Sequence, residues 1–154
     1  MLQSHSIDLE EDTSFLPNFN QDGLLPVIVI DHQTSQVLMF AYTNLEALHL
    51  TLSTKQAHFY SRSRNKLWKK GEQSGNVQLV KQIYIDCDQD TLIFAVEQIG
   101  QAACHTGRRS CFYRVLEYEP TNPTQIQLKI IDNQKFFDPQ KVYSEQTEQS
   151  SNFV

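Results

Sequence analysis

Residues 27–42 read VIVIDHQTSQVLMFAY, in which a polar segment separates two apolar runs. Val27-Ile28-Val29-Ile30 has the composition of a buried strand, because β-branched side chains pack well on a pleated sheet. Asp31 to Gln36 has the residues of a turn, and Val37 to Tyr42 is a second apolar run of strand length. The segment therefore predicts a β-hairpin, and hence antiparallel sheet, at the start of the core.

A helix and further strands are expected after this hairpin. Thr43 and Glu46 have the spacing of a capping box, so a helix should begin there and end near Lys55. Its apolar face would carry Leu45, Leu48 and Leu52. The expected later strands are His58 to Tyr60, Val77 to Asp86, Thr91 to Glu97 and Phe112 to Glu119. This order predicts a strand-dominated α+β domain with a mainly antiparallel sheet and a covering helix.

The composition suits one domain, since the chain has 154 residues, 40% hydrophobic and 20% charged. Residues 1–22 lack periodicity and predict a flexible leader, and residues 144–154 predict a disordered polar tail, which leaves a domain at 23–143. The net charge of -5 argues against general nucleic-acid binding. No apolar run is long enough to span a membrane and no secretory signal is present, so we expect a cytoplasmic protein without membrane contact.

The three cysteines predict a metal site, because an odd number of cysteines without a secretory signal is a poor disulfide framework. Cys104 and Cys111 flank a glycine turn, which allows both sulfurs to face one zinc ion. With Cys87 they make three thiolate ligands and leave a fourth position for water, as is typical of catalytic zinc. The alternative is a structural zinc completed by His105. A residue beside a ligand seldom binds the same ion, so His105 is interpreted as the proton-transfer group, with His58 second.

Asp86-Cys87-Asp88-Gln89-Asp90 predicts a second metal site. In an extended segment, alternate residues share a face, so the three aspartates would lie on one face and Cys87 on the other. Converging carboxylates repel one another, and Mg²⁺ is the usual remedy. A solvated acidic turn is the alternative for such a triplet taken alone.

Basic residues cluster in spite of the acidic total charge. Arginine forks and neutral hydroxyl donors suit phosphate groups. The candidate phosphate-binding residues are Arg62, Arg64, Lys69, Lys70, Ser74, Arg108 and Arg109. Trp68, among these cations, is a candidate either for stacking on a base or for filling the core.

Taken together, four motifs resemble phosphoribosyl-AMP cyclohydrolase. They are Ser61-Arg62-Ser63-Arg64, Leu67-Trp68-Lys69-Lys70-Gly71-Glu72 with Ser74-Gly75-Asn76, the aspartate run, and Ala103-Cys104-His105-Thr106-Gly107-Arg108-Arg109-Ser110-Cys111. The resemblance runs from about Gly23 to Tyr113, and Phe137-Asp138-Pro139 to Tyr143 is similar to the family's C-terminal end. Members commonly have glycine where this chain has Gln89, which puts the local backbone in question.

The resemblance implies an enzyme of histidine biosynthesis, in its monofunctional form. It would open the adenine ring of 1-(5-phosphoribosyl)-AMP at the N1–C6 bond by hydrolysis and yield the phosphoribosyl-formimino-AICAR phosphate product. It also implies a homodimer with one zinc ion per subunit, in which Cys87 of one subunit joins Cys104 and Cys111 of the other, and with magnesium on Asp86, Asp88 and Asp90.

Two rival functions are weaker. A zinc deaminase also attacks adenine at C6, but the chain lacks the His-x-Glu and Pro-Cys-x-x-Cys signature. A binding module with structural zinc is the other, and it predicts that chelation unfolds the chain.

Overall fold

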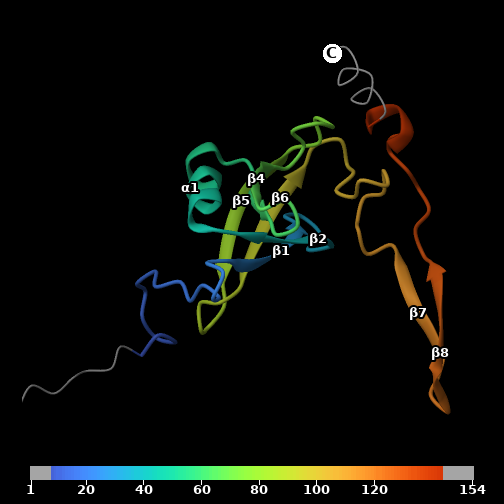
Figure 1. The fold of residues 1–154 in the computed structure, drawn as a ribbon, viewed down its shortest axis with the longest axis horizontal. Helices are drawn as coiled ribbons and strands as arrows, with labels where there is room; N and C mark the ends of the chain where they lie inside the picture. Colours follow the sequence, from blue (N-terminus) through green and yellow to red (C-terminus); the bar gives the residue numbers. More distant parts are fainter. Residues whose placement is uncertain (1–7, 144–154) are drawn as a thin grey trace, which may run out of the picture.

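The computed structural model describes residues 8–143, and the tail predicted to be disordered, 144–154, lies outside the described residues, as do residues 1–7. The chain forms a strand-dominated α+β domain (Figure 1). Its elements in chain order are β1 (Leu25–Asp31), β2 (Val37–Thr43), α1 (Leu45–Thr54), β3 (His58–Ser61), β4 (Lys66–Lys69), β5 (Gln78–Ile85), β6 (Leu92–Gln98), β7 (Arg114–Glu119) and β8 (Asn122–Ile130).

Six of these strands form one mixed sheet in the order β4-β3-β2-β1-β6-β5. The predicted hairpin is present, because β1 pairs antiparallel with β2 from Leu25↔Thr43 to Ile30↔Val37. On its other side β1 pairs parallel with β6, and the remaining neighbours in the sheet pair antiparallel. β1 therefore lies inside the sheet, which explains why Val27 and Val29 are fully buried.

Helix α1 packs against β2 and β3. Its N-cap is Asn44, whose side chain accepts the Ala47 N–H, so the predicted capping box at Thr43 is wrong by one residue. The predicted leucine face is also partly wrong, because the buried residues are Ala47, Leu48 and Thr51. Leu45 and Leu52 are exposed. The Thr51 hydroxyl explains part of this register, since it lies between α1 and the first residue of β3, where it accepts the His58 N–H.

Strand β4 is an element that the sequence pattern did not predict. Two of its four residues, Lys-Leu-Trp-Lys, are charged, and the strand is too short to show alternation. The strand forms because β3 offers a partner, with Phe59 opposite Trp68 and their rings 5.1 Å apart. Phe94 in β6 stacks on Phe59 with the ring centres 5.8 Å apart, so these aromatic residues join strands from both halves of the sheet through the core.

β7 and β8 form a separate two-stranded sheet, which extends away from the main sheet (Figure 1). Strand β8 begins at Asn122 and pairs antiparallel with β7 from Arg114↔Ile130 to Glu119↔Asn122. Residues on both strands are exposed along their whole length. Among residues 8–143 no helix has the length and apolar character of a membrane span.

Candidate active site

A cavity of about 690 Å³ lies between strand β2, the segment around β4 and the cysteine loop. It brings together several of the residues that the sequence singled out, from positions far apart in the chain. The predicted residues that line it are Arg62, Arg64, Trp68, Lys69, Lys70, Ser74, His105 and Cys111. A cavity of this size and mixed character suits a small polar ligand with an aromatic part.

The cationic wall of the cavity comes from residues 61–74. Arg62 and Arg64 are exposed in the turn between β3 and β4, and the Arg62 guanidinium lies 4.1 Å from the ring centre of Tyr42. That contact holds a positive charge at the rim without neutralising it. Trp68 packs partly against the core and also lines the cavity.

Lys70 faces inward, in contrast to its neighbours. Its ammonium group donates to the backbone carbonyl of Ala103, next to the cysteine loop. Burial lowers the pKa of Lys70, and the charges of Cys111 and Cys104 act in the opposite direction. Lys70 therefore places its charge beside the two thiols. Because its ammonium group is already hydrogen-bonded to Ala103, it is less suited to bind phosphate than the sequence predicted.

The cysteine loop is closed by backbone hydrogen bonds. Ala103 N–H donates to Arg109 O at 3.0 Å, and Cys104 N–H donates to Arg108 O at 3.1 Å. Strand β2 fixes the other end, since Cys111 N–H donates to Leu38 O at 2.8 Å. These bonds place the two thiols beside each other, as the spacing predicted.

The two thiols differ in protonation. A hydrogen bond from Cys111 lowers the pKa of Cys104 to about 5, and the Thr106 hydroxyl, 3.1 Å from Cys104 Sγ, acts in the same direction. The same hydrogen bond, together with burial, raises the pKa of Cys111. One sulfur is thus poised as a thiolate, which is the form that binds a soft metal ion.

Cys87 does not join this pair within one chain. It is exposed in the turn between β5 and β6, whereas Cys104 is buried. Within residues 8–143 no third cysteine, histidine or carboxylate atom completes a compact ligand group with Cys104 and Cys111. A single chain therefore brings two thiols together.

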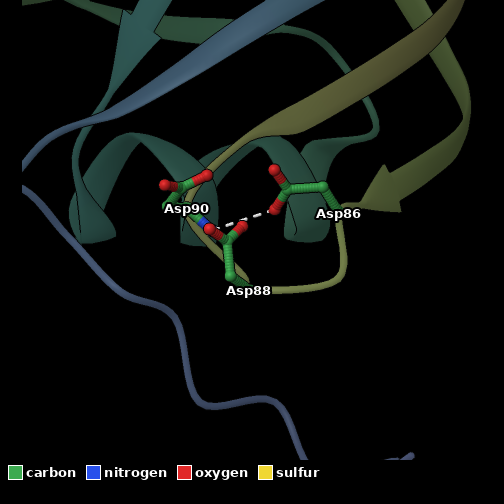
Figure 2. A group of neighbouring side chains, drawn as sticks. All are labelled: Asp86, Asp88 and Asp90. Atoms are coloured by element: carbon green, nitrogen blue, oxygen red, sulfur yellow. Dashed lines mark hydrogen bonds between the residues drawn. The ribbon is translucent and has the colours of Figure 1, made fainter. Parts of the chain in front are cut away.

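The three aspartates converge, but not by strand alternation as expected (Figure 2). Residues 86–90 form a turn, and one ligand atom from each carboxylate lies within 4.8 Å of the others. The turn closes because Asp86 Oδ1 accepts the N–H groups of Asp90 at 3.0 Å and of Thr91 at 3.2 Å. The predicted extended geometry is wrong, because the two hydrogen bonds to Asp86 Oδ1 bend the chain into a turn. This turn brings the three carboxylates together.

The electrostatics of the aspartates follow from this turn. Slight burial opposes ionisation of Asp86, but the N–H groups of Asp90 and Thr91 outweigh it and lower the pKa of Asp86. Desolvation and the charges of Asp86 and Asp90 raise the pKa of Asp88. Gln89 has φ 57°, a conformation that glycine adopts without strain, so the backbone at this position suits glycine as well.

The histidines are separated by the fold. His105 is exposed and lines the cavity beside the cysteines. His58 is buried in β3, its Nδ1 lies 2.7 Å from the carbonyl of Gln56, and it does not line the cavity. Of the two predicted general bases, only His105 is in position to reach a ligand there.

Arg108 and Arg109 do not line the cavity, although they were predicted to bind phosphate. Arg108 is buried, donates to Asn133 and lies over the ring of Tyr113. Arg109 forms an ion pair with Asp31 at 2.7 Å. Both guanidinium groups have partners within this chain that no local sequence pattern could indicate.

The structure adds lining residues that were not among the predicted site residues. They are Tyr42, Tyr60, Glu72 and Tyr143, among others. Burial and the charge of Cys104 raise the pKa of Tyr143, which comes from the C-terminal end of the described chain. The alternation of β2 could have pointed to Tyr42, but Tyr143 reaches the cavity only through tertiary packing.

Comparisons with known proteins match the sequence of this chain to one family. The family model described as phosphoribosyl-AMP cyclohydrolase matches residues 39–113. A protein of that name from Rhizobium rhizogenes is 50% identical over 137 residues, covering 88% of this chain and 90% of the relative. Those from Methanoregula boonei (54% identical; 81% and 92% covered) and Bradyrhizobium diazoefficiens (49% identical; 92% and 99% covered) carry the same name. The chain belongs to the phosphoribosyl-AMP cyclohydrolase family.

Proposed function

We propose that this chain is a hydrolase of histidine biosynthesis that opens the adenine ring of 1-(5-phosphoribosyl)-AMP at the N1–C6 bond. The observation that carries the proposal is the cavity in which His105 and Cys111 face the cationic segment around Arg62 and Lys69. A nucleotide with a phosphate at each end needs an aromatic wall and separate cations, and this cavity offers both.

The thiol pair fits zinc, which is a borderline-soft ion that prefers thiolate ligands. Cys104 and Cys111 lie side by side, and Cys104 is poised as a thiolate. Cys87 of the partner subunit would supply the third sulfur. Zinc bound there would supply the Lewis acidity that activates a water molecule for hydrolysis.

The aspartate turn fits magnesium, since hard divalent cations prefer several carboxylate oxygens. Asp86, Asp88 and Asp90 would hold the ion, which would neutralise charge on a phosphate or orient the ribose. The like-charge contact at Asp88 supports this assignment, because a cation relieves it.

Other residues of the chain would transfer the proton and bind the substrate. His105 lies at the cavity and would relay the proton between the attacking water and the departing N1. Arg62, Arg64 and Lys69 would bind phosphate, with Ser74 as a neutral donor. Trp68 offers an aromatic surface for the base. Lys70 would compensate the charge of the thiolates instead of meeting substrate.

The β7–β8 hairpin supports a homodimer. Leu116 pairs with Leu128 and Tyr118 with Ile126, which puts four exposed apolar side chains on one face. The opposite face carries Val115 but is otherwise polar, and it holds the Lys129–Glu117 ion pair. A lone two-stranded hairpin is marginally stable in water, so an apolar face of this kind needs a partner surface. Free cysteines suit the reducing cytoplasm, where we place the enzyme.

The test is to supply phosphoribosyl-AMP, follow the purine absorbance, and quantify zinc per chain. Wild type should turn over the substrate, and Cys104→Ser and His105→Asn should lose activity by roughly 100-fold or more, the scale of acid–base and metal contributions. Of the two variants, only His105→Asn should keep the zinc content of wild type. Full turnover by Cys104→Ser would rule out the zinc assignment.

Sharing of the zinc site between subunits is tested by mixing inactive chains. Cys87→Ser with Cys104→Ser should restore activity, because one site of a mixed dimer keeps all its ligands. The matched control is Cys104→Ser with Cys111→Ser, in which both sites stay broken and no activity returns. Equal outcomes for the two mixtures, with subunit exchange verified, would contradict a shared site.

A further inference from the structure

Gln89 connects the acidic turn to a distant segment of the chain. It is only 5% exposed although it lies between two aspartates. Its side-chain Oε1 accepts the Leu16 N–H at 2.8 Å, and its Nε2 donates to the Ser14 carbonyl at 3.1 Å. Its backbone carbonyl accepts the Asn18 N–H at 2.8 Å. The side-chain oxygen, the side-chain nitrogen and the backbone carbonyl of Gln89 are thus all hydrogen-bonded to residues more than seventy positions away in the chain.

The leader is fastened on its other side as well. Phe19 packs against the core cluster. The Asn20 side chain then accepts the N–H groups of Asp22 at 2.9 Å and Leu24 at 3.0 Å, at the start of β1. The segment 14–18 is therefore held between the acidic turn and the body of the domain.

The turn needs an external tether. One oxygen from each of Asp86, Asp88 and Asp90 lies within 4.8 Å of the others, and like charges at that distance repel. Gln89 also has φ 57°, a left-handed conformation that costs free energy in a residue with a side chain. The bonds to Ser14, Leu16 and Asn18 are contacts that offset this cost.

We propose that Gln89 is a positioning residue that fastens residues 14–18 to the acidic turn and thereby holds the three carboxylates in the arrangement that binds a divalent cation. The inference rests on the magnesium site of the proposed function. It assigns a role to residues 14–18, which would belong to the cation site although they contribute no ligand to it.

The test variant is Gln89→Asn, because asparagine tolerates a positive φ and keeps the amide, but its side chain is one methylene too short to reach both Ser14 and Leu16. Gln89→Gly is the second variant, since it suits the backbone and removes the amide altogether. The matched control is Gln101→Asn, the same change at φ 62° on an exposed residue that is bonded to neither Ser14 nor Leu16.

Two readouts are independent of turnover. Amide hydrogen exchange of Leu16 should rise by roughly tenfold or more in both Gln89 variants, while Asn18 changes less because its acceptor is a backbone carbonyl. The Kd for Mn²⁺, followed by electron paramagnetic resonance, should rise roughly tenfold, the lower end of what loss of a ligand-orienting group costs. Gln101→Asn should leave both unchanged.

The outcomes separate this inference from the site on which it rests. Tight Mn²⁺ binding by wild type with an unchanged Kd in both Gln89 variants overturns the inference alone. Equal weakening by Gln101→Asn overturns it too, since the effect would then be general. Absence of Mn²⁺ binding by wild type overturns the magnesium proposal and this inference together.

Discussion

Gly107 in the cysteine loop touches the C-terminal segment at close range, and replacing it with alanine tests whether that contact holds the site. Gly107 has φ 88°, and an added Cβ would lie 2.4 Å from the carbonyl oxygen of Phe137, a separation that real Cβ atoms essentially never show. The obstacle is backbone, so no side-chain rotation relieves it. Either the cysteine loop or residues 135–137 must move.

The cost has two parts. Forcing a non-glycine residue into the left-handed region costs about 1–2 kcal/mol. Moving the segments apart also breaks the hydrogen bond from Phe136 N–H to Gly107 O, 2.8 Å long, which adds about 1 kcal/mol if a buried group stays unpaired. We expect Gly107→Ala to lower the free energy of unfolding by about 2–3 kcal/mol.

The matched control is Gly23→Ala. Gly23 has φ 73° but no heavy atom within 4 Å of the added Cβ, so it reports the backbone cost alone. Urea denaturation at fixed protein concentration should place Gly107→Ala at least about 1 kcal/mol below Gly23→Ala. Gly107→Ala should also raise KM, because the displaced segment carries Tyr143 to the cavity. Equal destabilisation by the two variants would refute the close contact.

Three more outcomes follow from named contacts. Desolvation raises the pKa of Asp31, but its hydrogen bonds and the charge of Arg109 outweigh it and lower that pKa. The free energy of unfolding of wild type should therefore exceed that of Asp31→Asn by about 1–2 kcal/mol at pH 7, and this difference should disappear as the pH falls through the folded-state pKa, below about 4. Urea denaturation at pH 7 and pH 3 measures the difference, and an equal difference at both pH values would contradict the prediction. Lys70→Met should weaken zinc binding roughly tenfold in chelator competition, since the ammonium beside the thiolates is lost, whereas Lys69→Met should not. Leu128→Glu should dissociate the proposed dimer in sedimentation measurements, whereas Gln127→Glu, on the opposite face, should leave it intact.

Local periodicity explains what the sequence could predict of the fold. The strands around Val27 and Phe94 were identifiable because their apolar runs reflect burial in the middle of the sheet. Strand β4 was not identifiable, because it is short, carries Lys66 and Lys69 at its ends, and forms through pairing with β3. The helix was predicted, but its buried face depends on Thr51 meeting β3, a tertiary contact.

In the candidate site, too, local features could be predicted from the sequence and long-range contacts could not. The thiol pair and the aspartate cluster follow from short spacings, so the sequence located both groups. The partners of Arg109 and Gln89 lie more than seventy residues away along the chain, and such contacts leave no local signal. Charge beside a cysteine therefore suggested a phosphate ligand at Arg109, where the fold instead uses the guanidinium to fix Asp31.

The proposed zinc and magnesium sites are coupled through the backbone. Cys87 is bonded to Asp86 and Asp88, and adjacent Cα atoms are about 3.8 Å apart. If Cys87 completes the partner's zinc site, the same turn must bring its aspartates to the partner's cavity, so each complete site combines the cysteine loop of one chain with the acidic turn of the other. Asp88→Asn should then restore activity when mixed with Cys104→Ser but not with Cys87→Ser. The reverse pattern, recovery with Cys87→Ser but not with Cys104→Ser, would mean that the acidic turn serves its own chain's cavity.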